Sequence, residues 1–213
     1  MPRTRIKICG ITRPADALAA EMAGCDAIGL VFWPQSPRYV TIDQATEIID
    51  CLSPLVKSVG VFVGATADEV ADTADCVGLR AAQICGDLPR GDWQTLAKMI
   101  PLIRAIRVGD QPPTPGDRMN GVADYLFDSA DPNLPGGSGR AFDWSLLAKG
   151  GSFPRVWLAG GLNLANVADA IRAVRPFAVD VSTGVEESPG FKSADKIAAF
   201  VNAVHAADTR MDG

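Results

Sequence analysis

The stretch Lys7-Ile8-Cys9-Gly10-Ile11-Thr12 sets a pattern that the rest of the chain repeats. Polar and apolar side chains alternate over residues 5–8, and this alternation is the period of a β-strand. Gly10 then permits a sharp turn, and Thr12 can cap the helix that follows. The stretch therefore predicts a strand that ends at Cys9, then a loop, then a helix.

The same pattern of strand, loop and helix recurs along the chain. Apolar runs predict seven further strands, at residues 27–32, 56–63, 78–84, 102–108, 124–127, 155–159 and 178–182. Apolar residues at helical spacing and capping signals predict helices that begin near residues 15, 41, 66, 92, 144, 163 and 193. Residues 109–121 are rich in proline and glycine, so we expect the fifth helix to be short or irregular.

Eight strands that alternate with helices or loops predict an α/β protein with a closed, parallel, eight-stranded (β/α)8 TIM barrel. An open doubly wound sheet is the alternative, although it usually needs fewer units. No linker or low-complexity segment divides the sequence, so we expect one domain over residues 1–213.

Composition excludes several classes of function. A formal net charge of −5 argues against nucleic acid or an anionic membrane as a partner, and no apolar run approaches the roughly 20 residues of a membrane helix. The five cysteines have no C-x-x-C spacing, which fits a reduced cytoplasm and argues against disulfides or a zinc site. The single histidine, His205, rules out a Ser-His-Asp triad and a multi-histidine metal site, and we expect it at the surface.

The active site of a (β/α)8 barrel lies where the strands end and the loops begin. This rule selects Cys9 at the end of the first strand, Arg38 after the second strand and Asp128 at the end of the sixth strand. By position alone Cys9 would be a small buried apolar residue, but Lys7 on the same strand face would favour its reactive thiolate. Glycine-rich backbone follows the seventh and eighth strands, at Gly160, Gly161, Ser182, Thr183 and Gly184. Barrels commonly bind a phosphate there through backbone N–H groups, so the two strand ends together favour a phosphate site.

Several motifs occur together in a characteristic order. They are Lys7 to Thr12, Gly29 to Phe32 with Ser36-Pro37-Arg38, Val59 to Val63, Phe127-Asp128-Ser129, Gly136-Gly137-Ser138-Gly139 with Phe142-Asp143-Trp144, Leu158 to Leu162, and Val179 to Glu186 continuing to Gly190. In these motifs the chain resembles the phosphoribosylanthranilate isomerase family, whose members are barrel enzymes of tryptophan biosynthesis. The matches extend over nearly the whole chain.

The resemblance implies an Amadori rearrangement of N-(5-phosphoribosyl)anthranilate to 1-(2-carboxyphenylamino)-1-deoxyribulose 5-phosphate. A general acid, matched by Asp128, opens the furanose ring, and a general base, matched by Cys9, removes the proton from C2 of the sugar. Arg38 matches the arginine that binds the anthranilate carboxylate, and Asp180 matches a residue near the sugar hydroxyls. The implied enzyme needs no cofactor and no metal, and we expect a cytoplasmic monomer whose only partner is its small phosphosugar substrate.

Three positions depart from the family pattern. Cys85 stands where a histidine is usual, after Gln83, and both residues are expected to contact the substrate; Thr183 replaces a serine, and Ser193 replaces an aspartate. Two alternatives remain: the related sugar-isomerising barrel of histidine biosynthesis, and a non-catalytic or substrate-shifted phosphosugar-binding paralogue. Cys9 argues against the first, because that barrel uses an aspartate as its base, and the presence of both Cys9 and Asp128 argues against the second.

Overall fold

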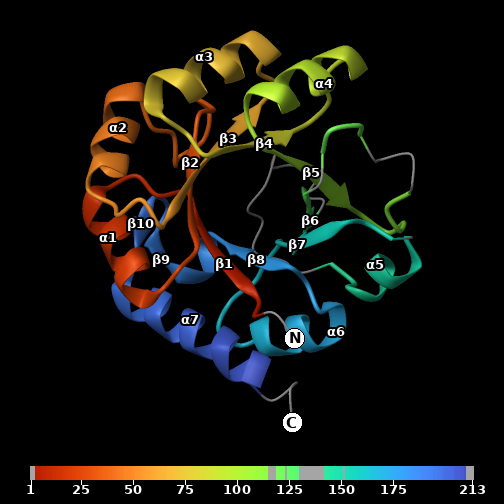
Figure 1. Ribbon diagram of the computed structural model, residues 1–213. Helices are drawn as coiled ribbons and strands as arrows, with labels where there is room; N and C mark the ends of the chain where they lie inside the picture. Colours follow the sequence, from red (N-terminus) through yellow and green to blue (C-terminus); the bar gives the residue numbers. More distant parts are fainter. Residues whose placement is uncertain (1–2, 115–118, 123, 130–141, 151, 210–213) are drawn as a thin grey trace.

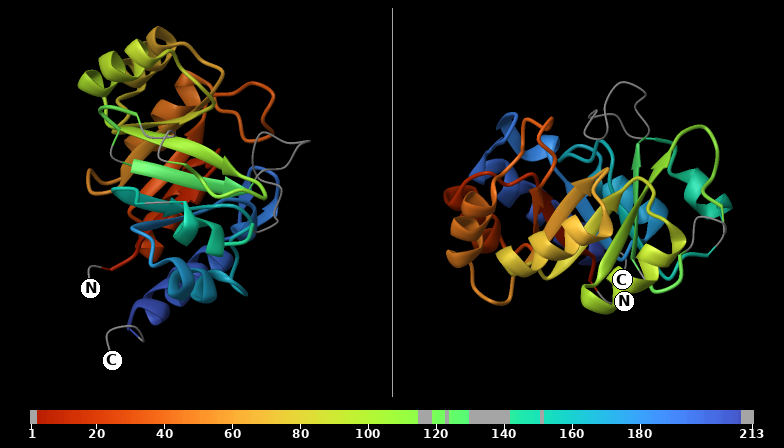
Figure 2. Two further views of the ribbon diagram at one scale, coloured as in Figure 1. Left: turned by 90° about the vertical axis from the view of Figure 1, so that its right-hand side faces the viewer. Right: turned by 90° about the horizontal axis from the view of Figure 1, so that it is seen from above.

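The computed structural model describes residues 3–114, 119–122, 124–129, 142–150 and 152–209. Eight parallel strands close into a barrel in the order of the sequence, with helices around the outside (Figure 1; Figure 2). The strands are β1 (Arg5–Cys9), β2 (Ala27–Val31), β3 (Lys57–Val63), β4 (Ala81–Cys85), β5 (Leu102–Val108), β6 (Asp124–Ser129), β7 (Arg155–Leu158) and β8 (Ala178–Val181). The predicted (β/α)8 barrel is confirmed.

The outer layer is built from seven described α-helices. They are α1 (Pro14–Ala23), α2 (Ile42–Asp50), α3 (Ala67–Val77), α4 (Arg90–Met99), α5 (Ser145–Lys149), α6 (Val167–Val174) and α7 (Ala194–Thr209). The predicted capping boxes at Thr41 and Thr66 are both present. Between β5 and β6, the part of the connection that the structure describes contains no helix, in line with the irregular segment expected there. Among the described residues, no helix has the length and apolar character needed to cross a membrane.

The eighth strand leads into a short extra structure. A 3-10 turn, η2 (Thr183–Val185), follows β8, and β9 (Glu186–Ser188) and β10 (Phe191–Lys192) then form an antiparallel pair. This hairpin lies beside α1 and α7 (Figure 1). It was not predicted from the sequence, because its strands are too short to show a period.

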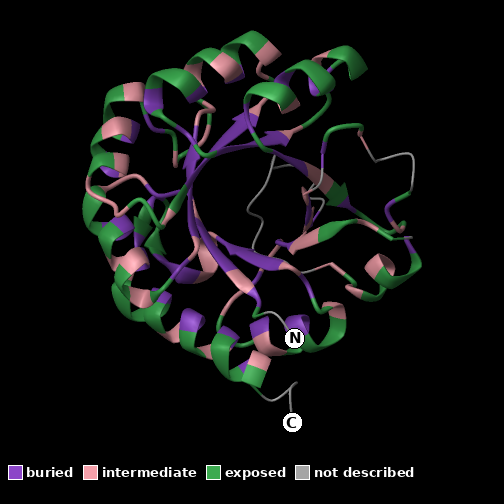
Figure 3. Ribbon diagram, in the orientation of Figure 1, coloured by how far each residue is buried: buried purple, intermediate pink, exposed green. Residues whose placement is uncertain are grey.

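Two layers of apolar side chains form the core, and most strand residues between them are buried, with β7 and the second half of β5 more exposed (Figure 3). The larger layer packs between the sheet and the helices, as Trp93 and Phe200 do. The smaller layer fills the barrel interior and consists of Ala27, Val59, Ala81, Ile103, Leu126 and Ala159. Since side chains alternate along a strand, the next inward positions toward the carboxyl ends are two residues further on, such as Gln83 after Ala81 and Asp128 after Leu126. Polar side chains therefore form the next layer of the barrel interior, on the side of the carboxyl ends of the strands.

Several expected boundaries and caps differ from the structure. The fourth strand begins at Ala81 rather than at residue 78, because Gly78 adopts φ +72° and ends α3 as its left-handed cap. Asn163 does not cap α6; its side chain instead accepts a hydrogen bond from the Ala165 amide in the preceding turn. β6 extends to Ser129, two residues beyond the expected boundary at residue 127, so Asp128 belongs to the hydrogen-bonded strand rather than lying just beyond it. His205 is exposed on α7, as expected.

Candidate active site

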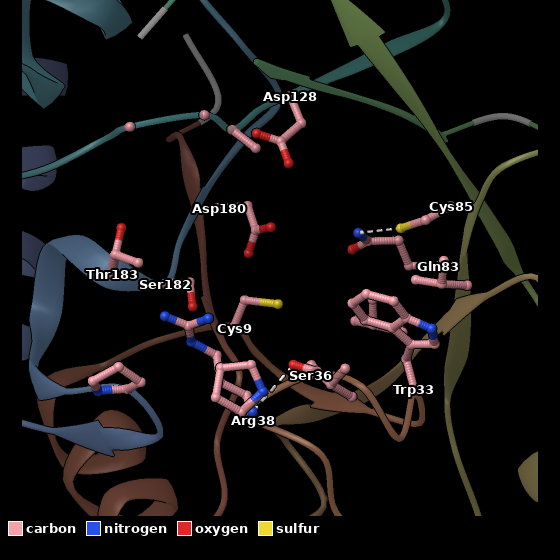
Figure 4. A pocket seen from close by; sticks show the side chains of 18 of the residues that line it. Cys9, Trp33, Ser36, Arg38, Gln83, Cys85, Asp128, Asp180, Ser182 and Thr183 are labelled. Carbon is pink, nitrogen blue, oxygen red and sulfur yellow. Dashed lines mark hydrogen bonds between the residues drawn. The ribbon is translucent and has the colours of Figure 1, made fainter. Parts of the chain in front are cut away.

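A cavity of about 440 Å³ opens at the carboxyl ends of the strands (Figure 4). Every predicted site residue except Gly184 lines it, namely Cys9, Arg38, Gln83, Cys85, Asp128, Gly160, Gly161, Asp180, Ser182 and Thr183. Trp33 also lines it and was not predicted, because no sequence pattern distinguishes this aromatic residue from a packing residue. The volume suits a small ligand. The predicted Gly136 to Gly139 loop lies outside the described residues.

Cys9 and Lys7 lie side by side on the inner face of β1. Lys7 is completely buried, and its Nζ donates to Gln83 Oε1 at 2.9 Å and to Asp180 Oδ1 at 3.0 Å. Both β1 side chains pass over Gly29 on the neighbouring strand β2. A Cβ atom at Gly29 would lie 2.7 Å from Cys9 Sγ and 3.0 Å from Lys7 Cε, so only glycine leaves room for this pair.

Opposing effects act on the Cys9 thiol. Burial raises the pKa of Cys9, and the Asp180 carboxylate raises it further, whereas the Lys7 ammonium lowers it. Lys7 thus favours the thiolate, as expected, but burial and Asp180 outweigh it, and the net pKa of Cys9 lies above its ordinary value. Although burial opposes its charge, Asp180 and Cys9 raise the pKa of Lys7, which therefore remains a cation. Lys7 therefore limits the rise in the pKa of Cys9 but does not reverse it.

Asp128 faces the cavity from β6. Burial, and after it the charge of Asp180, raises the pKa of Asp128 from 3.8 to about 6. The carboxylate accepts one hydrogen bond from the Ser129 amide, at 2.8 Å, which acts in the opposite direction. Gly160, at the end of β7, packs against this residue, since an added Cβ would lie 3.1 Å from Asp128 Oδ1. A carboxyl group with such a pKa holds its proton in part of the molecules near neutral pH.

Gln83 and Cys85 lie on the inner face of β4. Gln83 accepts from Lys7 and donates to Cys85 Sγ at 3.5 Å, so both ends of its amide already have partners. Burial raises the pKa of Cys85 to about 11, which keeps this thiol neutral. Cys85 therefore offers the cavity a small neutral surface and no group for acid–base chemistry near neutral pH.

Arg38 reaches the cavity from the loop after β2, and its guanidinium is held by Glu186. Arg38 Nε donates to Glu186 Oε1 at 2.8 Å, and Nη2 donates to Oε2 at 2.7 Å. Glu186 also accepts from Lys192 Nζ at 2.7 Å. Sequence reasoning missed the roles of Glu186 and Lys192. Glu186 pairs with Arg38, which lies 148 positions away in the sequence, and no local pattern reports such a contact.

The glycine-rich ends of β7 and β8 form one corner of the cavity. Gly160 and Gly161 adopt φ angles of +84° and +65°, which favour glycine, and within the described residues their amides donate to no other group. Gly184 does not line the cavity. A Cβ at this position would collide with the Leu162 carbonyl and Asn163, so glycine here allows the loops after β7 and β8 to approach closely. Free amides beside the start of η2 form a suitable environment for an anion.

Comparisons with known proteins identify the relatives of this chain. The family model of N-(5'-phosphoribosyl)anthranilate (PRA) isomerase matches residues 6–203. An N-(5'-phosphoribosyl)anthranilate isomerase of Pseudomonas paraeruginosa is 50% identical over 211 residues, which cover 96% of this chain and 96% of the relative.

Two solved structures are similar over almost the whole chain. The phosphoribosyl anthranilate isomerase of Thermotoga maritima aligns with a TM-score of 0.85 and 39% identity, covering 95% of this chain and 99% of the other. A phosphoribosyl anthranilate isomerase in complex with reduced 1-(o-carboxyphenylamino)-1-deoxyribulose 5-phosphate aligns with a TM-score of 0.80 and 37% identity, with the same coverage.

Proposed function

Because this chain belongs to the N-(5'-phosphoribosyl)anthranilate isomerase family, we propose that Asp128 and Cys9 are the general acid and general base of its reaction. The protein is an isomerase of tryptophan biosynthesis, and it converts N-(5-phosphoribosyl)anthranilate to 1-(2-carboxyphenylamino)-1-deoxyribulose 5-phosphate. One observation supports the proposal above the others. Cys9 from β1 and Asp128 from β6 line the same cavity, together with one guanidinium and one anion corner (Figure 4).

Ring opening requires a proton donor. Asp128 donates its proton to the furanose oxygen as the bond between this oxygen and C1 breaks, and the nitrogen lone pair forms a protonated Schiff base with C1. The pKa of about 6 supports this role, because a carboxyl group near its pKa at working pH can both hold and release a proton.

The second step removes the proton from C2. The protonated imine acidifies the C2–H bond, and the Cys9 thiolate takes this proton to give an enolamine. Protonation at C1 and loss of the proton from the C2 hydroxyl then give the ketone product. The positive charges of the imine and of Lys7 both favour the thiolate while substrate is bound, which offsets the effect of burial on the pKa of Cys9.

The remaining site residues bind the substrate. Arg38 pairs with the anthranilate carboxylate, for which the planar guanidinium is a suited donor. The backbone of Gly160, Gly161, Ser182 and Thr183 binds the phosphate. Asp180 lies near the sugar hydroxyls, and Gln83 and Cys85 form the wall of the cavity on the side of β4. A crystal soaked in sulfate or phosphate tests this arrangement, since an anion bound elsewhere and not at this corner would contradict it.

A direct assay tests the function as a whole. Conversion of the substrate should consume the anthranilate adduct and change its fluorescence, with no metal or cofactor added. Phosphoribosyl substrates of histidine biosynthesis should be poor substrates, because Cys9 replaces the aspartate base of that barrel. A protein that binds the substrate but leaves it unchanged would contradict the proposed roles of Cys9 and Asp128.

The same site bears on the assembly and location of the protein. The closed barrel by itself contributes every strand end that the structure describes at the cavity, and we propose a single domain over residues 1–213 that acts as a monomer. The five cysteines are free thiols, and the proposed base must stay reduced, which supports a location in the cytoplasm. Sedimentation velocity with and without substrate tests the monomer.

A further inference from the structure

Glu186 lies just outside the cavity lining. It is the first residue of β9, its side chain is only 5% exposed, and it contacts two cations, each of which links it to a residue that lines the cavity or is itself such a residue. One cation is Arg38 and the other is Lys192, whose side chain is completely buried. Glu186 itself does not line the cavity, so it acts through its neighbours.

The contact with Arg38 sets the direction of the guanidinium. Glu186 engages Nε and Nη2 with both carboxylate oxygens, in a bidentate pair that fixes the plane of the group. Nη1 has no hydrogen-bond partner within the described part of the chain and remains available to a ligand. Arg38 without Glu186 would keep its charge but lose this fixed orientation.

The contact with Lys192 leads to the anion corner. Lys192 Nζ donates to Glu186 Oε1 at 2.7 Å and also contacts Ser182, with 3.2 Å to the carbonyl oxygen and 3.3 Å to Oγ. In a trans peptide the C=O and the following N–H point in opposite directions. Lys192 therefore holds the Ser182 carbonyl on one side and turns the Thr183 N–H to the other.

The loop that carries Glu186 is itself anchored. The backbone carbonyl of Glu186 accepts a hydrogen bond from Lys196 Nζ at 2.7 Å, and Glu186 Oε1 accepts one from the Gly190 amide at 3.3 Å. The Lys192 amide donates to the buried Asp16 carboxylate of α1 at 3.2 Å. These contacts fix the hairpin to α1 and α7, so the carboxylate has little freedom to move.

We propose that Glu186 is a positioning residue that holds both ends of the substrate site, by orienting Arg38 directly and Ser182 through Lys192. The inference rests on the proposed function, in which Arg38 binds the aryl carboxylate and the corner beside Ser182 binds the phosphate. It predicts that one substitution, remote from both ligands, weakens binding at both ends. A residue that served Arg38 alone would weaken only one.

The experiment compares three variants by steady-state kinetics with two competitive inhibitors, anthranilate for the aryl end and inorganic phosphate for the other. Glu186→Gln keeps the shape and removes the charge, and it should raise both inhibition constants about tenfold or more, since it breaks a buried charged network. Arg38→Ala should raise the constant for anthranilate and leave that for phosphate nearly unchanged. Glu187→Gln, the exposed neighbour on the same strand, should change neither constant and is the matched control.

A split between KM and kcat separates positioning from general damage. Glu186→Gln should raise KM for the substrate while kcat changes less than about threefold, because C1 and C2 contact other residues. Circular dichroism shows whether each variant folds. If Glu186→Gln leaves two buried cations that prevent folding, Glu186→Asp carries the test, since it keeps the charge but is too short to maintain both contacts.

Each possible pattern has a distinct meaning. An increase in both constants supports the inference. If Arg38→Ala weakens anthranilate but the Glu186 variants change only one constant or neither, the inference is wrong and the proposed function stands. If Arg38→Ala leaves anthranilate binding unchanged, the proposed role of Arg38 is wrong, and the inference fails with it.

Discussion

Lys7 Nζ and Asp180 Oδ1 lie 3.0 Å apart inside the barrel, where β1 and β8 meet. Backbone register places the two residues directly opposite each other, so their pairing follows from closure of the sheet. Cys9 is the next inward residue of β1. The charges of Asp180 and Lys7 thus act on the pKa of the thiol in opposite directions, and Lys192 adds a smaller effect in the same direction as Lys7.

Replacement of Lys7 should therefore raise the pKa of Cys9. In Lys7→Met the thiol loses the charge that lowers its pKa, while burial and Asp180 still raise it. The rate of Cys9 alkylation should fall at neutral pH, and its midpoint should move to higher pH. The measurement is the alkylation rate against pH, with Cys9→Ala as the background.

A double variant controls for the unpaired carboxylate that Lys7→Met leaves behind. Lys7→Met combined with Asp180→Asn removes both charges, so the alkylation midpoint should move less than in the single variant. Equal midpoints in the wild type and in Lys7→Met would contradict the electrostatic role of Lys7.

Cys9→Ser should abolish most activity at every pH. A serine hydroxyl is too weak an acid to ionise here, and general bases contribute about 10²–10⁴-fold, so kcat should fall by at least this factor. The wild-type profile should decline at low pH, where the thiolate is protonated, and at high pH, where Asp128 has lost its proton. These limbs belong to the coupled pair rather than to either residue.

The matched control for Cys9→Ser is Cys76→Ser, which makes the same change at an exposed position on α3. Its kcat should equal that of the wild type. If Cys9→Ser also retains its kcat, Cys9 is a packing residue and the base has been misassigned.

The location of the site was predictable from the sequence for one physical reason. A parallel barrel brings the carboxyl ends of all its strands together, so residues that end strands must meet. Cys9, Asp128 and the glycines after β7 were placed correctly by this rule and by the periods of the strands. The sequence alone did not require the ligands proposed for them, which came from the family motifs.

The interactions behind the site were not predictable in this way. The contacts of Lys7 with Gln83 and Asp180 join residues 76 and 173 positions apart, and depend on the register of the closed sheet. The expectation for the Cys9 thiolate counted Lys7 and the bound imine but not Asp180, because the charge of Asp180 becomes a neighbour of Cys9 only when β8 pairs with β1. The Glu186 network lies on a hairpin whose strands have three and two residues, too few for a pattern.

Asp128→Asn should lower kcat and stabilise the folded state at high pH. The pKa of the wild-type Asp128 carboxyl is about 6 in the folded protein, above the ordinary 3.8. Ionisation of this carboxyl therefore destabilises the folded state relative to the unfolded chain. The penalty is absent below a pH of about 4, grows through the folded pKa, and reaches roughly 2–3 kcal/mol above it. Asparagine cannot ionise and escapes the penalty.

Denaturant unfolding at pH 8 and at pH 4 measures this effect. The variant should gain stability relative to the wild type at pH 8, and the gain should be much smaller at pH 4. At the same time kcat should fall by about 10²–10⁴-fold, because the amide has no acidic proton to give. The same stability difference at both pH values would mean that the Asp128 carboxylate is not destabilised by burial.

Gly29→Ala should impair catalysis although the residue bears no functional group. The added Cβ would lie 2.7 Å from Cys9 Sγ, closer than such atoms pack, so the sulfur must move; at 3.0 Å from Lys7 Cε it would also crowd the lysine. A small displacement of a catalytic group is costly, and kcat should fall by about tenfold to a hundredfold. Alkylation of Cys9 should also change, because the sulfur shifts relative to Lys7. The matched control is Gly91→Ala on α4. An added Cβ there has no neighbouring atom within 4 Å, and alanine favours the helix more than glycine does. Gly91→Ala should leave kcat unchanged and raise the melting temperature slightly. If Gly29→Ala matches this control in kcat, the side chains of Cys9 and Lys7 tolerate displacement, and their close packing over β2 is not needed for catalysis.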